Sequence, residues 1–136
     1  MNNEIKELYD TFADDYLTIS KKYLQINDSD IEETLMNHSA IYAYFAALLS
    51  FAKKVRDDLT IKLDKDEADI MAARRLALES GGTKATQGAL NSYVLSVPEL
   101  VSTRQKLVNA DSRYTLAKSL INALDHQKDC LVQISA

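Results

Sequence analysis

Residues 31–80 read IEETLMNHSAIYAYFAALLSFAKKVRDDLTIKLDKDEADIMAARRLALES and contain neither glycine nor proline. A cluster of N-cap formers, NDSD at residues 27–30, precedes them, and Gly81-Gly82 interrupts the helical pattern after them. These signals predict one helix over residues 30–80. At 1.5 Å per residue this helix would be about 75 Å long, which exceeds the diameter of a compact domain of this size. We therefore expect an elongated protein.

An apolar seam follows this helix in alternating steps of three and four residues. Its members are Leu35, His38, Tyr42, Phe45, Leu49, Ala52, Arg56, Leu59, Leu63, Asp66, Ile70, Ala73 and Ala77. Opposite charges alternate in the middle, at residues 53–58. The pattern predicts a surface there that is either solvated or salt-bridged between subunits, and a packed seam on either side.

The rest of the chain is also helical in pattern. Eighteen Leu and 16 Ala make up a quarter of the 136 residues, whereas Gly and Pro number three and one, which argues against all-β and α/β folds. We expect an acidic amphipathic helix over residues 1–27, a short helix over 83–95 capped by Thr83, and a final helix over 98–136 that Pro98 opens. The prediction is one all-α domain.

The formal net charge of −4 conceals an uneven distribution. Residues 1–34 carry a net charge of −6, whereas residues 70–118 carry +4. A basic middle behind an acidic front could offer an anion a binding surface.

Few features suggest a membrane or an oxidising compartment. The only cysteine, Cys130, cannot form an internal disulfide, and residues 1–4 do not resemble a signal sequence. The longest apolar run, residues 41–49, is nine residues long, against the roughly 20 that a spanning helix needs. We expect a cytoplasmic protein without a membrane anchor.

The reactive residues do not form a recognisable catalytic or metal site. His38 and His126 have no second ligand at metal spacing, residues 81–84 lack the glycine spacing and preceding strand of a phosphate loop, and residues 64–69 lack the glycine and final Glu of a calcium loop. The sequence predicts no enzyme activity, cofactor or metal.

A basic corner remains, formed by Arg74, Arg75 and Lys84 around Gly81-Gly82. Guanidinium groups, an ammonium group and the backbone N–H donors of a following helix are the usual components of a phosphate-binding surface. The alternative is that the two arginines only neutralise the C-terminal end of the long helix.

Three segments carry a family resemblance. They are Ala73–Gly82, Asn37–Ile41 and Ala123–Ile134. With the order of the expected helices, residues 30–136 resemble the UvsY-like phage recombination mediators.

This resemblance implies a ring-like homo-oligomer that binds single-stranded DNA and helps a RecA-like recombinase to replace the single-strand-binding protein. It implies phosphate contacts by the basic corner, with Lys62 and Lys65 as weaker candidates. It also implies that a C-terminal stripe packs the subunits together, namely Leu107, Tyr114, Ile121, Leu124 and Leu131. If the protein is phage-encoded, it would act in the host cytoplasm.

Two other functions are compatible with the sequence. A helical homo-oligomeric assembly adaptor without nucleic-acid binding would suit the acidic pI of about 5.1. A small regulator could instead bind a host enzyme through its acidic N-terminal helix by mimicking DNA. The densest aromatic group, Tyr42, Tyr44 and Phe45, could stack on bases, but its position along the seam favours a packing role.

Overall fold

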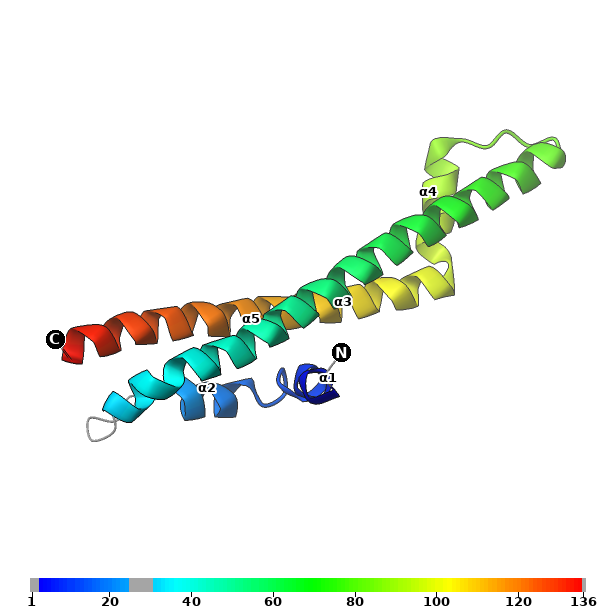
Figure 1. Ribbon diagram of the computed structural model, residues 1–136. Helices are drawn as coiled ribbons and strands as arrows, with labels where there is room; N and C mark the ends of the chain where they lie inside the picture. The colour runs from blue at the N-terminus through cyan, green and yellow to red at the C-terminus, as the bar shows by residue number, and fades with distance from the viewer. Residues whose placement is uncertain (1–2, 25–30, 136) are drawn as a thin grey trace. The chain divides into compact units, whose positions relative to one another are not determined.

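The structure, a computed structural model, describes residues 3–24 and 31–135, and every regular element in these ranges is an α-helix (Figure 1). The helices are α1 (Asn3–Thr11), α2 (Tyr16–Leu24), α3 (Ile31–Ser80), α4 (Gln87–Ser96) and α5 (Pro98–Ser135). The all-α fold class and the long central helix are thus confirmed. The expected N-cap cluster at residues 27–30 lies outside the described residues.

The helices pack as two compact units. Unit 1 contains the described residues up to Lys54 together with those from Asp111 onward, and unit 2 contains Val55–Ala110. Both α3 and α5 contribute to each unit. The division of α3 falls within the predicted charged interval, where Lys53 and Lys54 are exposed. The predicted solvated surface is thus present at these two lysines, whereas residues 55–57 are half-buried.

Unit 1 packs α1 and α2 antiparallel to the first part of α3, as two ring contacts show. Tyr9 meets Phe51 and Tyr23 meets Phe45 edge to face, each pair with ring centroids 5.1 Å apart. Its buried apolar side chains are Ile5, Tyr9, Phe12, Phe45, Leu48, Ala52, Ala117, Leu120, Ile121, Leu124 and Leu131. Removal of this surface from water is the main force that holds four helical segments together.

The acidic N-terminal region is two helices, so the prediction of a single helix over residues 1–27 is wrong within its described part. The carbonyl of Thr11 accepts hydrogen bonds from the backbone N–H groups of both Asp14 and Asp15 and closes a turn. The carbonyl of Asp15 then accepts from Ile19 N, which starts α2. Asp has low helix propensity and favours N-cap positions, so this turn suits the sequence. Phe12 stays fully buried across the break.

Unit 2 has a smaller core, in which α4 connects the end of α3 to the start of α5 (Figure 1). Leu63, Val94 and Leu100 form a buried cluster. Partly buried apolar side chains pack against it, namely Ile70, Met71, Val97 and Leu107. The predicted seam therefore packs as far as Ile70, whereas its last two members, Ala73 and Ala77, are exposed.

Candidate nucleic-acid interface

The end of α3 is fixed by a hydrogen-bonded turn that needs a glycine. Thr83 N donates to Leu78 O at 2.9 Å and Gly82 N donates to Glu79 O at 3.1 Å, which is the pattern of a Schellman motif. Gly82 has φ +80°, a conformation that L side chains rarely adopt. Gly82 thus terminates α3 at a defined place and directs the chain toward Lys84.

The short helix begins later than the sequence predicts. The N-cap of α4 is Thr86, whose side-chain oxygen accepts a hydrogen bond from Ala89 N at 3.2 Å, and the helix starts at Gln87. Thr83 instead belongs to the turn after α3, so the expected start at residue 83 is wrong. Both residues are threonines with cap potential, but Thr83 still belongs to the hydrogen-bonded end of α3, and α4 begins only after Thr86.

Two buried side chains hold α4 in unit 2. Leu90 is fully buried and Val94 nearly so. On the other side of the turn, α3 presents Ile70 and Met71 to the same core. This packing places the exposed side chains of α4 beside the last turns of α3.

Arg74 of α3 lies over the ring of Tyr93 of α4. The guanidinium carbon is 4.5 Å from the ring centroid, within the range of a cation–π contact. Both side chains belong to exposed residues. A cation–π contact does not use up the N–H donors of a guanidinium, so an anion can still accept them.

Arg75 contacts the first residue of α4. Its Nη2 donates to Gln87 Oε1 at 3.4 Å, and Gln87 Nε2 donates to Asn91 Oδ1 at 2.9 Å and to Met71 Sδ at 3.6 Å. The bond from Arg75 is long, and a guanidinium has five N–H donors. Arg75 is thus oriented by α4 while most of its donors stay available.

The basic corner has no carboxylate partner within the described residues. Neither Arg74, Arg75 nor Lys84 forms an ion pair there, and all three are exposed. Glu79 lies four residues after Arg75, a spacing that permits pairing along a helix, but the two do not come within ion-pair distance. An arriving phosphate would therefore not have to displace an internal acid.

The two weaker candidates lie apart from the basic corner. Lys62 forms an ion pair with Asp66 at 2.8 Å. Lys65 is exposed nine residues before Arg74 along α3, which places it roughly 14 Å away and about half a turn round the helix. The structure does not bring Lys62 or Lys65 together with Arg74, Arg75 and Lys84.

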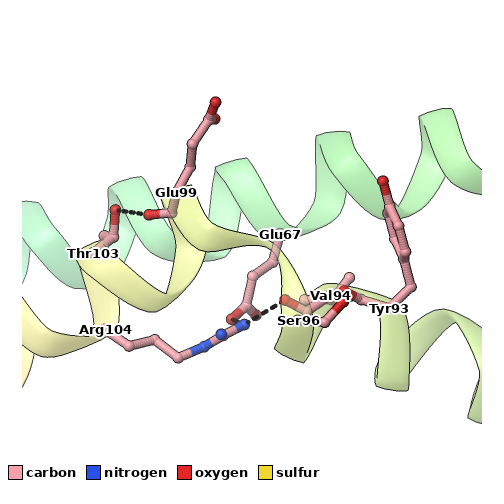
Figure 2. A network of polar contacts seen from close by, with 7 residues as sticks. All are labelled: Glu67, Tyr93, Val94, Ser96, Glu99, Thr103 and Arg104. Carbon is pink, nitrogen blue, oxygen red and sulfur yellow. Dashed lines mark hydrogen bonds and ion pairs between the residues drawn. The ribbon is translucent and has the colours of Figure 1, made fainter.

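An ion pair that the sequence analysis did not predict joins the helices of unit 2 that carry the basic corner. Arg104 of α5 donates to Glu67 Oε1 of α3 at 2.9 Å and to the carbonyl of Val94 of α4 at 3.2 Å (Figure 2). One side chain thus joins three helices. Because Arg104 and Glu67 are 37 residues apart, no local pattern signals their contact.

The C-terminal stripe is mostly interior to the chain. Leu124 and Leu131 are 0% exposed and Ile121 is 7% exposed in unit 1, while Leu107 and Tyr114 are half-buried. His38 Nε2 donates to the carbonyl of Leu124 at 2.8 Å, a contact between α3 and α5 of one chain. A second copy could reach Leu124 or Leu131 only by displacing this packing.

The two histidines contact other groups of the same chain. His38 is buried, and His126 lies 3.7 Å from the sulfur of Cys130 one turn further along α5. In the described ranges, no group of three His, Cys, Asp or Glu side chains is arranged to hold a metal ion. None of the described helices is long and apolar enough to cross a membrane.

The aromatic group on α3 is part of the packing of unit 1. Phe45 is buried and meets both Tyr23 and Tyr44 edge to face. Burial raises the pKa of the Tyr44 hydroxyl above its ordinary value of 10.0, and the charge of Glu4 adds to the effect. The exposed aromatic residue beside the arginines is Tyr93, and no sequence pattern separates it from its apolar neighbours.

Comparisons with protein-family models, with curated proteins and with solved structures found no match to this chain.

Proposed function

We propose that this protein binds single-stranded DNA through the basic corner of unit 2. The observation that carries the proposal is that Arg74, Arg75 and Lys84 border one turn without a carboxylate partner in the described part of the chain. Tyr93 and Gln87 orient the two guanidinium groups. Oriented arginines give short, charge-assisted hydrogen bonds to phosphate oxygens.

The wider role that we propose is that of a recombination mediator. In this role a homo-oligomer, arranged as a ring, would hold one DNA strand at many weak sites, and such an array binds far more tightly than one site. It would help a RecA-like recombinase to replace the single-strand-binding protein in the cytoplasm, which is that of the host if the protein is phage-encoded. The proposed mediator role rests on the resemblance to the UvsY-like mediators alone. DNA binding is supported in addition by the geometry of the basic corner.

Anisotropy of a labelled single-stranded oligonucleotide across a salt series tests the proposal. The double variant Arg74→Ala with Arg75→Ala should bind about tenfold more weakly or worse, because two charge-assisted contacts are lost. Its plot of log affinity against log salt should be shallower by about 0.7 for each phosphate contact removed. Light scattering on the same samples should report an unchanged mass.

Two further variants make this test specific. Lys118→Ala with Lys128→Ala removes the same charge from exposed positions of unit 1 and should leave the salt slope unchanged. Glu79→Gln removes the acid nearest to Arg75 in sequence and should strengthen binding about twofold. Equal affinity of the wild type and the arginine double variant would refute the basic corner as the DNA site.

The alternative proposal is a helical assembly adaptor without nucleic-acid binding. Exposed apolar side chains in unit 2 favour it, since Leu95, Val101 and Val108 are all at least 45% exposed. A folded oligomer that ignores DNA at low salt would support the adaptor.

A further inference from the structure

Tyr93 differs from the other aromatic residues of this chain in its exposure. All ten Phe and Tyr residues are described, and Tyr93, at 37%, has the largest exposed fraction among them. A tyrosine with more than a third of its surface exposed forgoes part of the burial that usually stabilises it. This most exposed ring also stands beside the one pair of adjacent arginines, Arg74 and Arg75.

The backbone that carries Tyr93 is held in place from several sides. The carbonyl of Tyr93 accepts from Ser96 Oγ at 2.7 Å, and the next carbonyl, that of Val94, accepts from Arg104 at 3.2 Å (Figure 2). Leu90, one turn earlier, is fully buried. In Figure 2 the ring of Tyr93 points away from the ion pair of Arg104 with Glu67. A ring on a fixed backbone loses little entropy when a ligand stacks on it.

Arg74 further restricts the ring and leaves part of it open. Its guanidinium carbon lies 4.5 Å from the ring centroid, so one side of the ring is covered by a cation. Tyr93 as a whole nevertheless stays 37% exposed, with the cationic side chains of Arg74 and Arg75 nearby. Nucleobases stack on exposed aromatic rings regardless of sequence, while the adjacent cations bind the phosphates.

From this geometry we infer that Tyr93 stacks on an unpaired base and gives the basic corner its preference for single strands over duplex DNA. The inference rests on the proposed function, because it names the strand that the same site selects. In a duplex each base is already stacked on its neighbours and paired, so Tyr93 could engage one only at the cost of unstacking it. Phosphate contacts alone do not discriminate in this way.

The test uses three labelled probes of equal length, namely a single strand, the matching duplex and a single strand of abasic sites. The abasic probe keeps the phosphates and lacks the bases. The wild type should bind the base-bearing single strand at least about fivefold more tightly than the abasic one, which corresponds to about 1 kcal/mol of stacking. The duplex should also bind more weakly than the single strand.

Substitutions at Tyr93 then locate the effect. Tyr93→Leu keeps an apolar side chain without a flat ring, and its affinity for the base-bearing strand should fall to that for the abasic strand. Tyr93→Phe should retain the wild-type difference. Helix content by circular dichroism should be the same in all three proteins, because the side chain is exposed.

The outcomes separate this inference from the proposed function. If Tyr93→Leu keeps the full wild-type preference for bases, or if the wild type binds both single strands equally, Tyr93 is not a stacking residue and the inference falls. If the abasic probe binds and Arg74→Ala with Arg75→Ala weakens it, the basic corner survives that failure. Absence of binding to every probe would overturn both.

Discussion

The left-handed backbone of Gly82 is the single-residue feature on which the candidate interface depends. Its φ of +80° and the bonds from Thr83 and Gly82 to the last turn of α3 set the direction in which the chain leaves the helix. A Cβ at this position would meet nothing within 4 Å, so the obstacle to a side chain is conformational strain and not a clash with neighbouring atoms.

Gly82→Ala should therefore lower the free energy of unfolding by about 1 kcal/mol, the cost of a left-handed conformation for an L residue. Gly81→Ala is the matched control, because Gly81 has no positive φ and its added Cβ would lie 3.6 Å from the carbonyl of Ala77, an ordinary contact. Urea denaturation followed by circular dichroism measures both. Equal effects of the two substitutions would contradict this account of the turn.

At the scale of single residues, the sequence predicts those features that depend only on residues close together in the chain. The break at Gly81-Gly82 and the basic character of Arg74 and Arg75 are local signals. The contact of Arg74 with Tyr93 has no local signal, because the two residues are 19 positions apart and lie on different helices, α3 and α4. Thr83 closes the turn that ends α3 while Thr86 caps α4, and a propensity scale does not distinguish two threonines three residues apart.

Among the described helices, α4 is the one that contains a glycine. It has ten residues and contains Gly88 one position after its start. Short helices gain most of their stability from packing, here through Leu90 and Val94. Gly88 has no neighbour within 4 Å of a built Cβ and no positive φ.

Gly88→Ala should stabilise α4 by up to about 1 kcal/mol, because alanine has higher helix propensity and costs less chain entropy on folding. Amide hydrogen exchange at Leu90 and Val94 should slow by about fivefold where local opening controls it. Single-strand affinity should stay equal or rise, since Tyr93 would be held more firmly. Faster exchange at these amides would mean that the glycine serves a contact not visible in this conformation.

The N-terminal helices show what periodicity alone cannot detect. Ile5, Leu8, Phe12, Tyr16 and Ile19 follow one another at helical steps, so the pattern reads as continuous. The turn over residues 12–15 nonetheless ends α1 and begins α2. The apolar spacing reports which side faces the core, whereas the polar residues Thr11, Asp14 and Asp15 determine where the backbone hydrogen bonds change partner.

At the scale of the whole chain, the long helix α3 packs against α5 of the same molecule. A 50-residue helix invites the inference that its seam must be covered by other subunits, but α5 packs against it in unit 1 and again in unit 2. The length of α3 does not by itself require other subunits to cover its seam, because the final helix α5 is 38 residues long and packs along it within each unit. The stripe on α5 and the seam on α3 cover each other.

This packing makes a prediction about Leu124, which is 0% exposed beside the buried His38. Leu124→Glu should abolish cooperative melting of unit 1, because an unpaired carboxylate in an apolar core costs several kcal/mol. Asn122→Glu adds the same charge at an exposed position two residues away and should change stability by less than about 0.5 kcal/mol. Thermal melts by circular dichroism, with light scattering for mass, distinguish the two roles of the stripe. A Leu124→Glu protein that stays fully helical and loses only its oligomeric mass would show that the stripe joins subunits, since a core residue cannot accept a charge without loss of the fold.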